Sequence, residues 1–292
     1  MDVFPNVISR LILDFLNIDE QNYVSNNWRS IVNVCEFSAK HGYLELLKWA
    51  RSQGCDWDAW TCANAAKNNH LELLQWARSQ GCDWDKWTCA DAAENGNLEL
   101  LKWARWKGCV WDEGTCANAA KNNHLELLKW ARSSAADPSG GSQCFPWNQL
   151  TCEYAALNGH LELLKWARSQ GCDWNADTCA NAAENGHLEL LKWARSSAAD
   201  PSGGSQGCPW DAQTCSNAAK SGHLELLKWA RLHGCEWDLW TCAYAAGSGN
   251  LELLQWARSQ GCPWDQKTCS YATFNNHSEL LKWAISQGCP QF

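Results

Sequence analysis

The sequence predicts an all-α solenoid built from nine stacked helix-turn-helix repeats. The phrase Leu-Glu-Leu-Leu recurs, mostly every 27 residues, from Leu44 to an altered ninth copy at Ser278. Each repeat holds two short segments that suit helices, and only glycine or asparagine stands at the position between them. Helices shorter than about 12 residues are marginal alone, so the repeats are expected to stack and bury their apolar faces together.

Residues 55–81 illustrate the repeat unit. The Ala-rich segment 61–68 predicts a first helix, which Asp58 or Thr61 would cap. Asn69 then predicts a tight left-handed turn. A second helix is expected from about Leu71 to Ser79, because its apolar residues follow a helical spacing, and Gly81 ends it.

The repeats define the predicted domain organisation. A repeat domain is expected over residues 33–292, after an N-terminal helical cap or separate segment over 1–32. The same string, Ser-Ser-Ala-Ala-Asp-Pro-Ser-Gly-Gly-Ser-Gln, is inserted at 133–143 and at 196–206. These inserts are expected to be loops, and their identity indicates that a block of two repeats was duplicated.

Composition excludes several classes of function. The chain has 292 residues, 24 basic and 32 acidic, and a formal net charge of -8 without a basic cluster, which disfavours nucleic-acid binding. No apolar stretch approaches the roughly 20 residues needed to span a bilayer, and residues 1–14 do not form a signal peptide. We therefore expect a protein that is not secreted and does not bind membranes. It should stay in the cytoplasm or reach the nucleus, and a viral protein would lie in the host cytoplasm or the virion.

The 18 cysteines form two series, one in the first helix and one after the second helix of each repeat. A zinc site would combine, for example, Cys55, Cys62 and His70. The close Cys-x-x-Cys spacing of zinc sites is absent, however, and the histidine column breaks at Asn97 while the cysteines continue. Small buried thiols explain the pattern better, so we expect no metal and no other cofactor.

Most of the 22 tryptophans also form columns, in the second helix and in the loop between repeats, and are expected to pack between neighbouring repeats. Positions that differ between repeats are instead free to recognise a partner. They lie just before the first-helix threonine and within that helix. The candidate partner-binding residues are Trp60, Lys86, Trp87, Asp91, Glu113, Leu150, Tyr154, Asp177, Gln213, Leu239, Trp240, Tyr244, Lys267 and Tyr271. Neutral drift between repeats is the alternative interpretation.

The repeats resemble the ankyrin family in their pattern of threonine, paired alanines and Gly-His-Leu-Glu. In the repeat that follows residue 175, the matching residues are Thr178, Ala182, Ala183, Gly186, His187, Leu188 and Glu189. The resemblance covers about residues 33–292 and implies protein binding on a concave face. Such short, Trp-rich repeats look like those expanded in giant DNA viruses of amoebae and in some protists. The link from Gly54 to Thr61 is too short for the usual protruding β-finger, so we expect tight loops in which the β-fingers are shortened or absent, with little strand content.

The N-terminal segment resembles an F-box, which implies binding to a Skp-type adaptor of a ubiquitin ligase. The residues that match its pattern are Phe4, Pro5, Val7, Ile8, Ile12, Phe15, Leu16, Val24 and Trp28. The stretch from Leu16 to Val24 is shorter than the family usually has, and a plain end cap for the first repeat is the alternative.

Two functions remain after these exclusions. No nucleophile with a base, phosphate loop or paired carboxylates occurs in the sequence, so an enzyme is not expected. The first function is a protein-interaction scaffold, which the F-box-like segment would turn into an adaptor that recruits substrates to a host ubiquitin ligase. The second is a structural protein that self-assembles head to tail through the C-terminal repeat, into filaments, tubes or part of a virion, because Leu280, Leu281, Trp283 and Ile285 lack an obvious polar cover.

Overall fold

The computed structural model describes residues 34–133, 146–196 and 207–291, and every regular element in these ranges is a helix. Each repeat contributes two helices, which we call helix one and helix two. The helix-one elements are α3 (Val34–His41), α5 (Ala59–Lys67), α7 (Lys86–Glu94), α9 (Glu113–Lys121), α11 (Gln149–Leu157), α13 (Ala176–Glu184), α15 (Ala212–Lys220), α17 (Leu239–Gly247) and α19 (Gln266–Phe274). The helix-two elements are α4 (Leu44–Ser52), α6 (Leu71–Ser79), α8 (Leu98–Trp106), α10 (Leu125–Ala131), α12 (Leu161–Ser169), α14 (Leu188–Ala194), α16 (Leu224–Leu232), α18 (Leu251–Ser259) and α20 (Ser278–Ser286). The predicted helical solenoid is confirmed, and the described ranges contain no strand.

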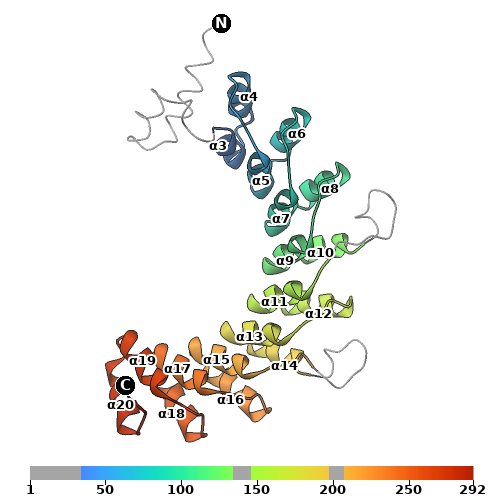
Figure 1. The fold of residues 1–292 in the computed structure, drawn as a ribbon. Coiled ribbons are helices and arrows are strands. Elements are labelled where there is room, and N and C mark those ends of the chain that lie inside the picture. Colours follow the sequence, from blue (N-terminus) through green and yellow to red (C-terminus); the bar gives the residue numbers. More distant parts are fainter. Residues whose placement is uncertain (1–33, 134–145, 197–206, 292) are drawn as a thin grey trace, which may run out of the picture. The chain divides into compact units, whose positions relative to one another are not determined.

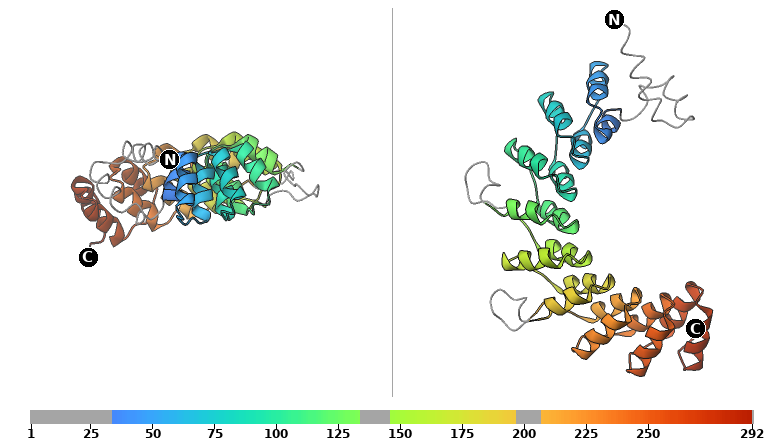
Figure 2. Two further views of the ribbon diagram at one scale, coloured as in Figure 1. Left: turned by 90° about the horizontal axis from the view of Figure 1, so that it is seen from above. Right: turned by 180° about the vertical axis from the view of Figure 1, so that it is seen from behind.

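The chain divides into two compact units, and the boundary between them falls within α9. The first unit contains α3–α8 and the second contains α10–α20. Within each unit, every helix one packs on its own helix two and on helix one of the next repeat, as α13, α15 and α17 do. Figures 1 and 2 show the two rows of helices in each unit from opposite sides.

Alanines make the helix-one row the closely packed one. Ala182 and Ala183 of α13 are fully buried, and their small side chains let neighbouring helices approach closely. Helix two supplies the larger apolar side chains. Leu190, Leu191 and Ala194 of α14 are buried at the spacing expected for one face of a helix. The predicted stacking of marginal helices around a shared apolar layer therefore holds in the described repeats.

The ends of the helices are fixed by short-range polar contacts. The Asp58 carboxylate accepts a hydrogen bond from the Trp60 backbone N–H at 3.0 Å and so caps α5. The turn into helix two needs a left-handed residue, because Asn69 has φ 60° and Gly186 has φ 73°. This is why only asparagine and glycine occupy that position.

The tryptophan columns join one repeat to the next. The Arg51 guanidinium lies 4.1 Å from the ring centroid of Trp57, which belongs to the following repeat. Trp57 in turn meets the edge of Trp76 at 5.8 Å between centroids. The same arginine–tryptophan–tryptophan stack recurs along both units, as at Arg231, Trp237 and Trp256. The predicted packing role of these columns is confirmed.

The cysteines also connect repeats. The Cys82 thiol donates to the Asp58 carbonyl at 3.4 Å, and the Cys62 thiol lies 3.9 Å from the Cys82 carbonyl. The hydrogen bond to Cys82 and burial together raise the pKa of Cys62, while burial raises the pKa of Cys35 to about 11. In the described ranges no three His, Cys, Asp or Glu side chains gather as metal ligands would. The interpretation as buried core thiols is confirmed.

We expect these thiols to resist alkylation in the folded protein, because the thiolate is the reactive form and burial disfavours it. Sixteen of the seventeen described cysteines are buried, and Cys55 alone is partly exposed. With iodoacetamide at pH 8, Cys55 should therefore be modified at least about 100-fold faster than Cys62 or Cys82. Peptide mapping by mass spectrometry over a time course measures this, with urea-unfolded protein as the control in which all sites react alike. Equal labelling of Cys55 and Cys62 in folded protein would contradict the packing.

Three further expectations concern residues outside the described ranges. The F-box-like residues 4–29 and the predicted boundary at 32/33 lie outside those residues, and so does most of each insert. At the second insert, Cys208 N–H still donates to the Ala194 carbonyl at 2.7 Å, the bond that Cys82 makes to Ala77 at 3.0 Å. The chain therefore resumes the repeat geometry after the insert.

No helix in the described ranges is long and apolar enough to cross a membrane.

Candidate binding face

The positions that vary between repeats lie in three rows along helix one, because consecutive helix-one elements stack in register. In the second unit we call these rows the helix-one face. The first row holds Leu150, Asp177, Gln213, Trp240 and Lys267. The second row holds Tyr154, Asn181, Asn217, Tyr244 and Tyr271. The third row holds Leu157, Glu184, Lys220, Gly247 and Phe274.

Four predicted residues meet in one cluster on α17 and α19, which we call the aromatic patch. The ring centroid of Trp240 lies 5.5 Å from that of Tyr244 and 6.3 Å from that of Tyr271. The Tyr244 and Tyr271 centroids are 5.8 Å apart, and the Lys267 ammonium lies 4.1 Å from the Trp240 ring centroid. All four side chains are partly exposed. The patch therefore offers aromatic faces and one cation to solvent.

Gly247 makes room for this patch. A Cβ added at Gly247 would lie 2.9 Å from the Tyr271 ring, so any side chain there would displace the tyrosine. Other repeats carry a larger residue at this position, such as Glu184 or Lys220. The missing side chain at Gly247 thus leaves the space on α17 that the Tyr271 ring occupies. Phe274, at the equivalent position in the next repeat, is 86% exposed and extends the apolar surface.

The first unit uses the same positions differently. Trp60 and Trp87 are 57% and 48% exposed, but they stand above Asn64 and Asp91 instead of tyrosines. The Lys86 ammonium forms an ion pair with Asp112 at 2.8 Å and lies 5.4 Å from the Trp87 ring centroid. The first unit therefore presents separate tryptophans on a polar background.

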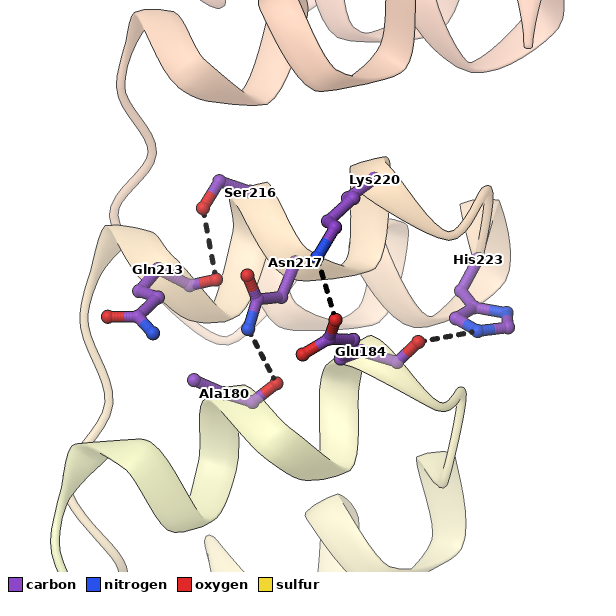
Figure 3. Close-up of polar contacts among 7 residues, drawn as sticks. All are labelled: Ala180, Glu184, Gln213, Ser216, Asn217, Lys220 and His223. Atoms are coloured by element: carbon purple, nitrogen blue, oxygen red, sulfur yellow. Dashed lines mark hydrogen bonds and ion pairs between the residues drawn. The ribbon is translucent and has the colours of Figure 1, made fainter. Parts of the chain in front are cut away.

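A polar network ties α13 to α15 within the second unit (Figure 3). Lys220 forms an ion pair with Glu184 at 2.8 Å, and the Asn217 amide donates to the Ala180 carbonyl at 3.2 Å. A ring nitrogen of His223, Nε2, contacts the Glu184 carbonyl at 3.2 Å. Equivalent histidine contacts recur at other repeats, for example from His187 to the Leu157 carbonyl at 3.1 Å. These histidines therefore bond to the backbone of the preceding repeat.

Glu153 is a buried carboxylate on α11 that the sequence analysis missed. It is 9% exposed and accepts a hydrogen bond from the Asn175 amide at 2.9 Å. Burial raises the pKa of Glu153, the Asn175 amide lowers it, and the nearby Asp177 raises it. Most other repeats have aspartate where Asn175 stands, and alanine or serine where Glu153 stands. Asn175 donates a hydrogen bond to Glu153, whereas the aspartate common at this position would place a further negative charge beside the buried carboxyl group.

Replacing Glu153 with glutamine should stabilise the protein at pH 7. The raised pKa means that the folded state resists ionisation of Glu153, so wild-type stability falls as pH rises from near 4.5 through the pKa in the folded protein. The thermal midpoint of Glu153→Gln should exceed that of wild type at pH 7 and match it near pH 4. The control is Glu184→Gln, which removes an exposed ion pair and should lower stability at pH 7 by no more than about 1 kcal/mol. A Glu153→Gln protein less stable than wild type at pH 7 would contradict this account.

Comparison with known proteins adds a likeness of fold. No family profile matches the chain, and no curated protein matches it. Among solved structures, the chain is similar to the human ASB11 ankyrin repeat domain, with 14% sequence identity and a TM-score of 0.42. That match covers 55% of this chain and 81% of the other.

The other predicted partner-binding residues do not form a cluster with one another. Leu150, Asp177 and Gln213 are exposed in the first row of the helix-one face, and Glu113 is exposed in α9. Leu239 and Tyr154 are partly exposed. Burial raises the pKa of Asp91, while Lys67 lowers it. The aromatic patch is therefore the one place in the described second unit where several predicted aromatic residues meet.

The sequence carried a signal for the residues that were missed. Glu153, Asn175 and Gly247 each depart from the residue common at their repeat position, as the predicted residues do. Phe274 does the same. A comparison of every helix-one position, extended to the last turn and to the cap, would have found all four.

Proposed function

We propose that this chain is a non-catalytic scaffold that binds a partner protein through the helix-one face. The observation that carries this proposal is the aromatic patch formed by Trp240, Tyr244, Tyr271 and Lys267. Tryptophan and tyrosine are enriched at energetically dominant positions of protein interfaces. Their clustering at positions that differ from the preceding repeat, which carries Gln213 and Asn217 there, supports recognition instead of simple stacking.

We propose a non-catalytic role because the histidines, aspartates and cysteines that could act in catalysis make structural contacts instead. The histidines contact backbone carbonyls, as His223 does with Glu184. The N-capping aspartates accept backbone hydrogen bonds, as Asp238 does from Trp240. A hydrogen bond with Cys262 and burial raise the pKa of the Cys242 thiol. Each group thus has a structural task that supports the stack.

The experiment is affinity capture with the full chain and a variant whose face is replaced by residues from other repeats. The variant combines Trp240→Gln, Tyr244→Asn and Tyr271→Asn, which copy Gln213 and Asn217. A matched control carries Glu162→Ala, Glu189→Ala and Glu225→Ala on exposed positions of helix two. Partners should be lost by the face variant and kept by the control, while both retain the wild-type circular dichroism. Retention of every partner by the face variant overturns the proposal.

The finer role as a ubiquitin-ligase adaptor rests on the F-box-like residues at the N-terminus. Its test is a binary pull-down between the purified full chain and a purified Skp-type adaptor. The variant Pro5→Ala, Ile8→Ala, Trp28→Ala should abolish the interaction, and the face variant described above should keep it. No binding by the wild-type chain removes the ligase role and leaves the scaffold role standing.

Self-association is the second candidate, and a specific apolar surface favours it. Leu281 of α20 is partly exposed although its counterpart Leu74 is fully buried, and Ile285 is 38% exposed. Phe274 of α19, in the same repeat, is also exposed. Light scattering should then show a mass that grows with concentration and returns to that of a monomer in Phe274→Asn, Ile285→Arg. A wild-type monomer at all concentrations removes this candidate.

A further inference from the structure

The first row of the helix-one face carries two charges without ion-pair partners among the described residues. Asp177 lies near one end, and its carboxylate accepts only a 3.3 Å hydrogen bond from the Asn175 amide. Lys267 lies at the other end, where its ammonium rests on the Trp240 ring. In the third row, by contrast, Glu184 and Lys220 neutralise each other. The first row is thus negative near α13 and positive at α19.

The negative end is reinforced from below. Glu153 lies beneath the same surface, and its carboxylate shares the Asn175 amide with Asp177. A cation placed beside Asp177 would face both carboxyl groups, and its charge would favour the ionised form of each. Between the two ends, Gln213 is exposed and uncharged, and the aromatic patch begins at Trp240.

We propose that the second unit binds an extended peptide segment with a basic residue opposite Asp177, an aromatic or aliphatic residue on the aromatic patch, and an acidic residue opposite Lys267. This inference rests on the proposed scaffold function and names the chemistry of the partner. Complementary charges at the two ends set the direction of the peptide, and the aromatic patch supplies the apolar anchor.

The spacing of the repeats predicts the spacing within the peptide. Neighbouring packed helices lie about 10 Å apart, and an extended chain advances about 3.3 Å per residue, so the peptide advances about three residues per repeat. Asp177 and Trp240 lie two helix-one positions apart, through α15. The basic and apolar residues should therefore be separated by about six positions, and the acidic residue should follow about three later.

The first experiment is selection of a random 16-residue peptide library, displayed on phage, against the purified full chain. Enriched peptides should share a lysine or arginine, then an aromatic or large aliphatic residue about six positions away, then an aspartate or glutamate, in a single direction. A synthetic peptide of the consensus is then measured by fluorescence anisotropy. No enrichment, or a consensus without the basic residue, overturns the inference.

The second experiment reverses charge on the protein. Asp177→Lys should lower the affinity for the consensus peptide by about tenfold or more. The same variant should bind more tightly a peptide in which glutamate replaces the basic residue. Tyr244→Asn, which copies Asn217, should lower the affinity for both peptides by the same factor. Trp87→Ala, at the matched tryptophan position in the first unit, should leave the affinity for both peptides unchanged. Binding that is insensitive to Asp177→Lys, or equally sensitive to Trp87→Ala, overturns the assignment to this row.

Failure of this inference can be told apart from failure of the scaffold function. If affinity capture still finds partners that the face variant loses, while the charge reversal has no effect on them or on the peptides, only the peptide chemistry is wrong. If the face variant keeps every captured partner, the scaffold function itself fails. Circular dichroism of Asp177→Lys and Tyr244→Asn confirms that both variants remain folded.

Discussion

Replacing Leu227 with alanine is expected to cost about 2–5 kcal/mol of unfolding free energy. Leu227 is fully buried in α16, where it fills the layer between helix one and helix two. Its removal leaves a cavity that the alanine-rich neighbours are too small to fill. The same helix offers a matched control in Leu232, which is 83% exposed. Leu232→Ala should change stability by less than about 0.5 kcal/mol.

Urea unfolding followed by tryptophan fluorescence measures this difference. Every described repeat contains at least one tryptophan, so the signal reports on every repeat. Because stability in a repeat protein sums over neighbouring repeats, Leu227→Ala should also separate the transition into two steps if the stack breaks at α16. Equal midpoints for the two variants would contradict the burial described for Leu227.

Replacing Gly186 with alanine is the second large expected effect, with a loss of about 2–3 kcal/mol from two sources. Gly186 has φ 73°, which an alanine adopts at a cost of about 1–2 kcal/mol. An added Cβ would also lie 2.7 Å from the His223 ring, which is held by its contact with the Glu184 carbonyl. The ring must therefore move and lose that hydrogen bond, at a cost of about 1 kcal/mol.

Gly171 separates the two sources. It has φ 79°, but an added Cβ there would meet nothing within 4 Å. Gly171→Ala should therefore show only the backbone cost, about 1–2 kcal/mol. In a His223→Ala background, the two glycine substitutions should cost the same, because the obstructing ring is gone. A persistent difference in that background would show that another contact is responsible.

These two substitutions also show why the glycines of this chain are not equivalent. Both positions read from the sequence as helix-ending residues, and both are left-handed. Only the structure reveals that the turn glycine lies under a histidine from the next repeat, whereas the glycine after helix two faces open space. The histidine column therefore depends on the glycine column across the repeat interface.

The helix-one face illustrates how far a sequence comparison between repeats reaches. Trp240, Tyr244, Lys267 and Tyr271 were identified only as positions that vary, since neighbouring repeats carry glutamine or asparagine there. Their ring distances follow from the stacking of α17 on α19. Trp60 and Trp87 vary in the same way but remain separate above polar residues. The residues one turn after each tryptophan thus decide whether it joins an aromatic cluster, as Trp240 does, or stands alone, as Trp60 and Trp87 do.

The sequence by itself determined the local structure of this protein. The 27-residue period, the Gly or Asn turn and the apolar spacing of helix two specify helices through short-range physics, which is repeated in each unit. The tertiary structure alone decided which variable residues meet, that Glu153 is buried beside Asn175, and that Asp177 and Lys267 lack ion-pair partners among the described residues. Such properties depend on contacts between residues more than 20 positions apart, which stacking creates and a repeat pattern does not encode.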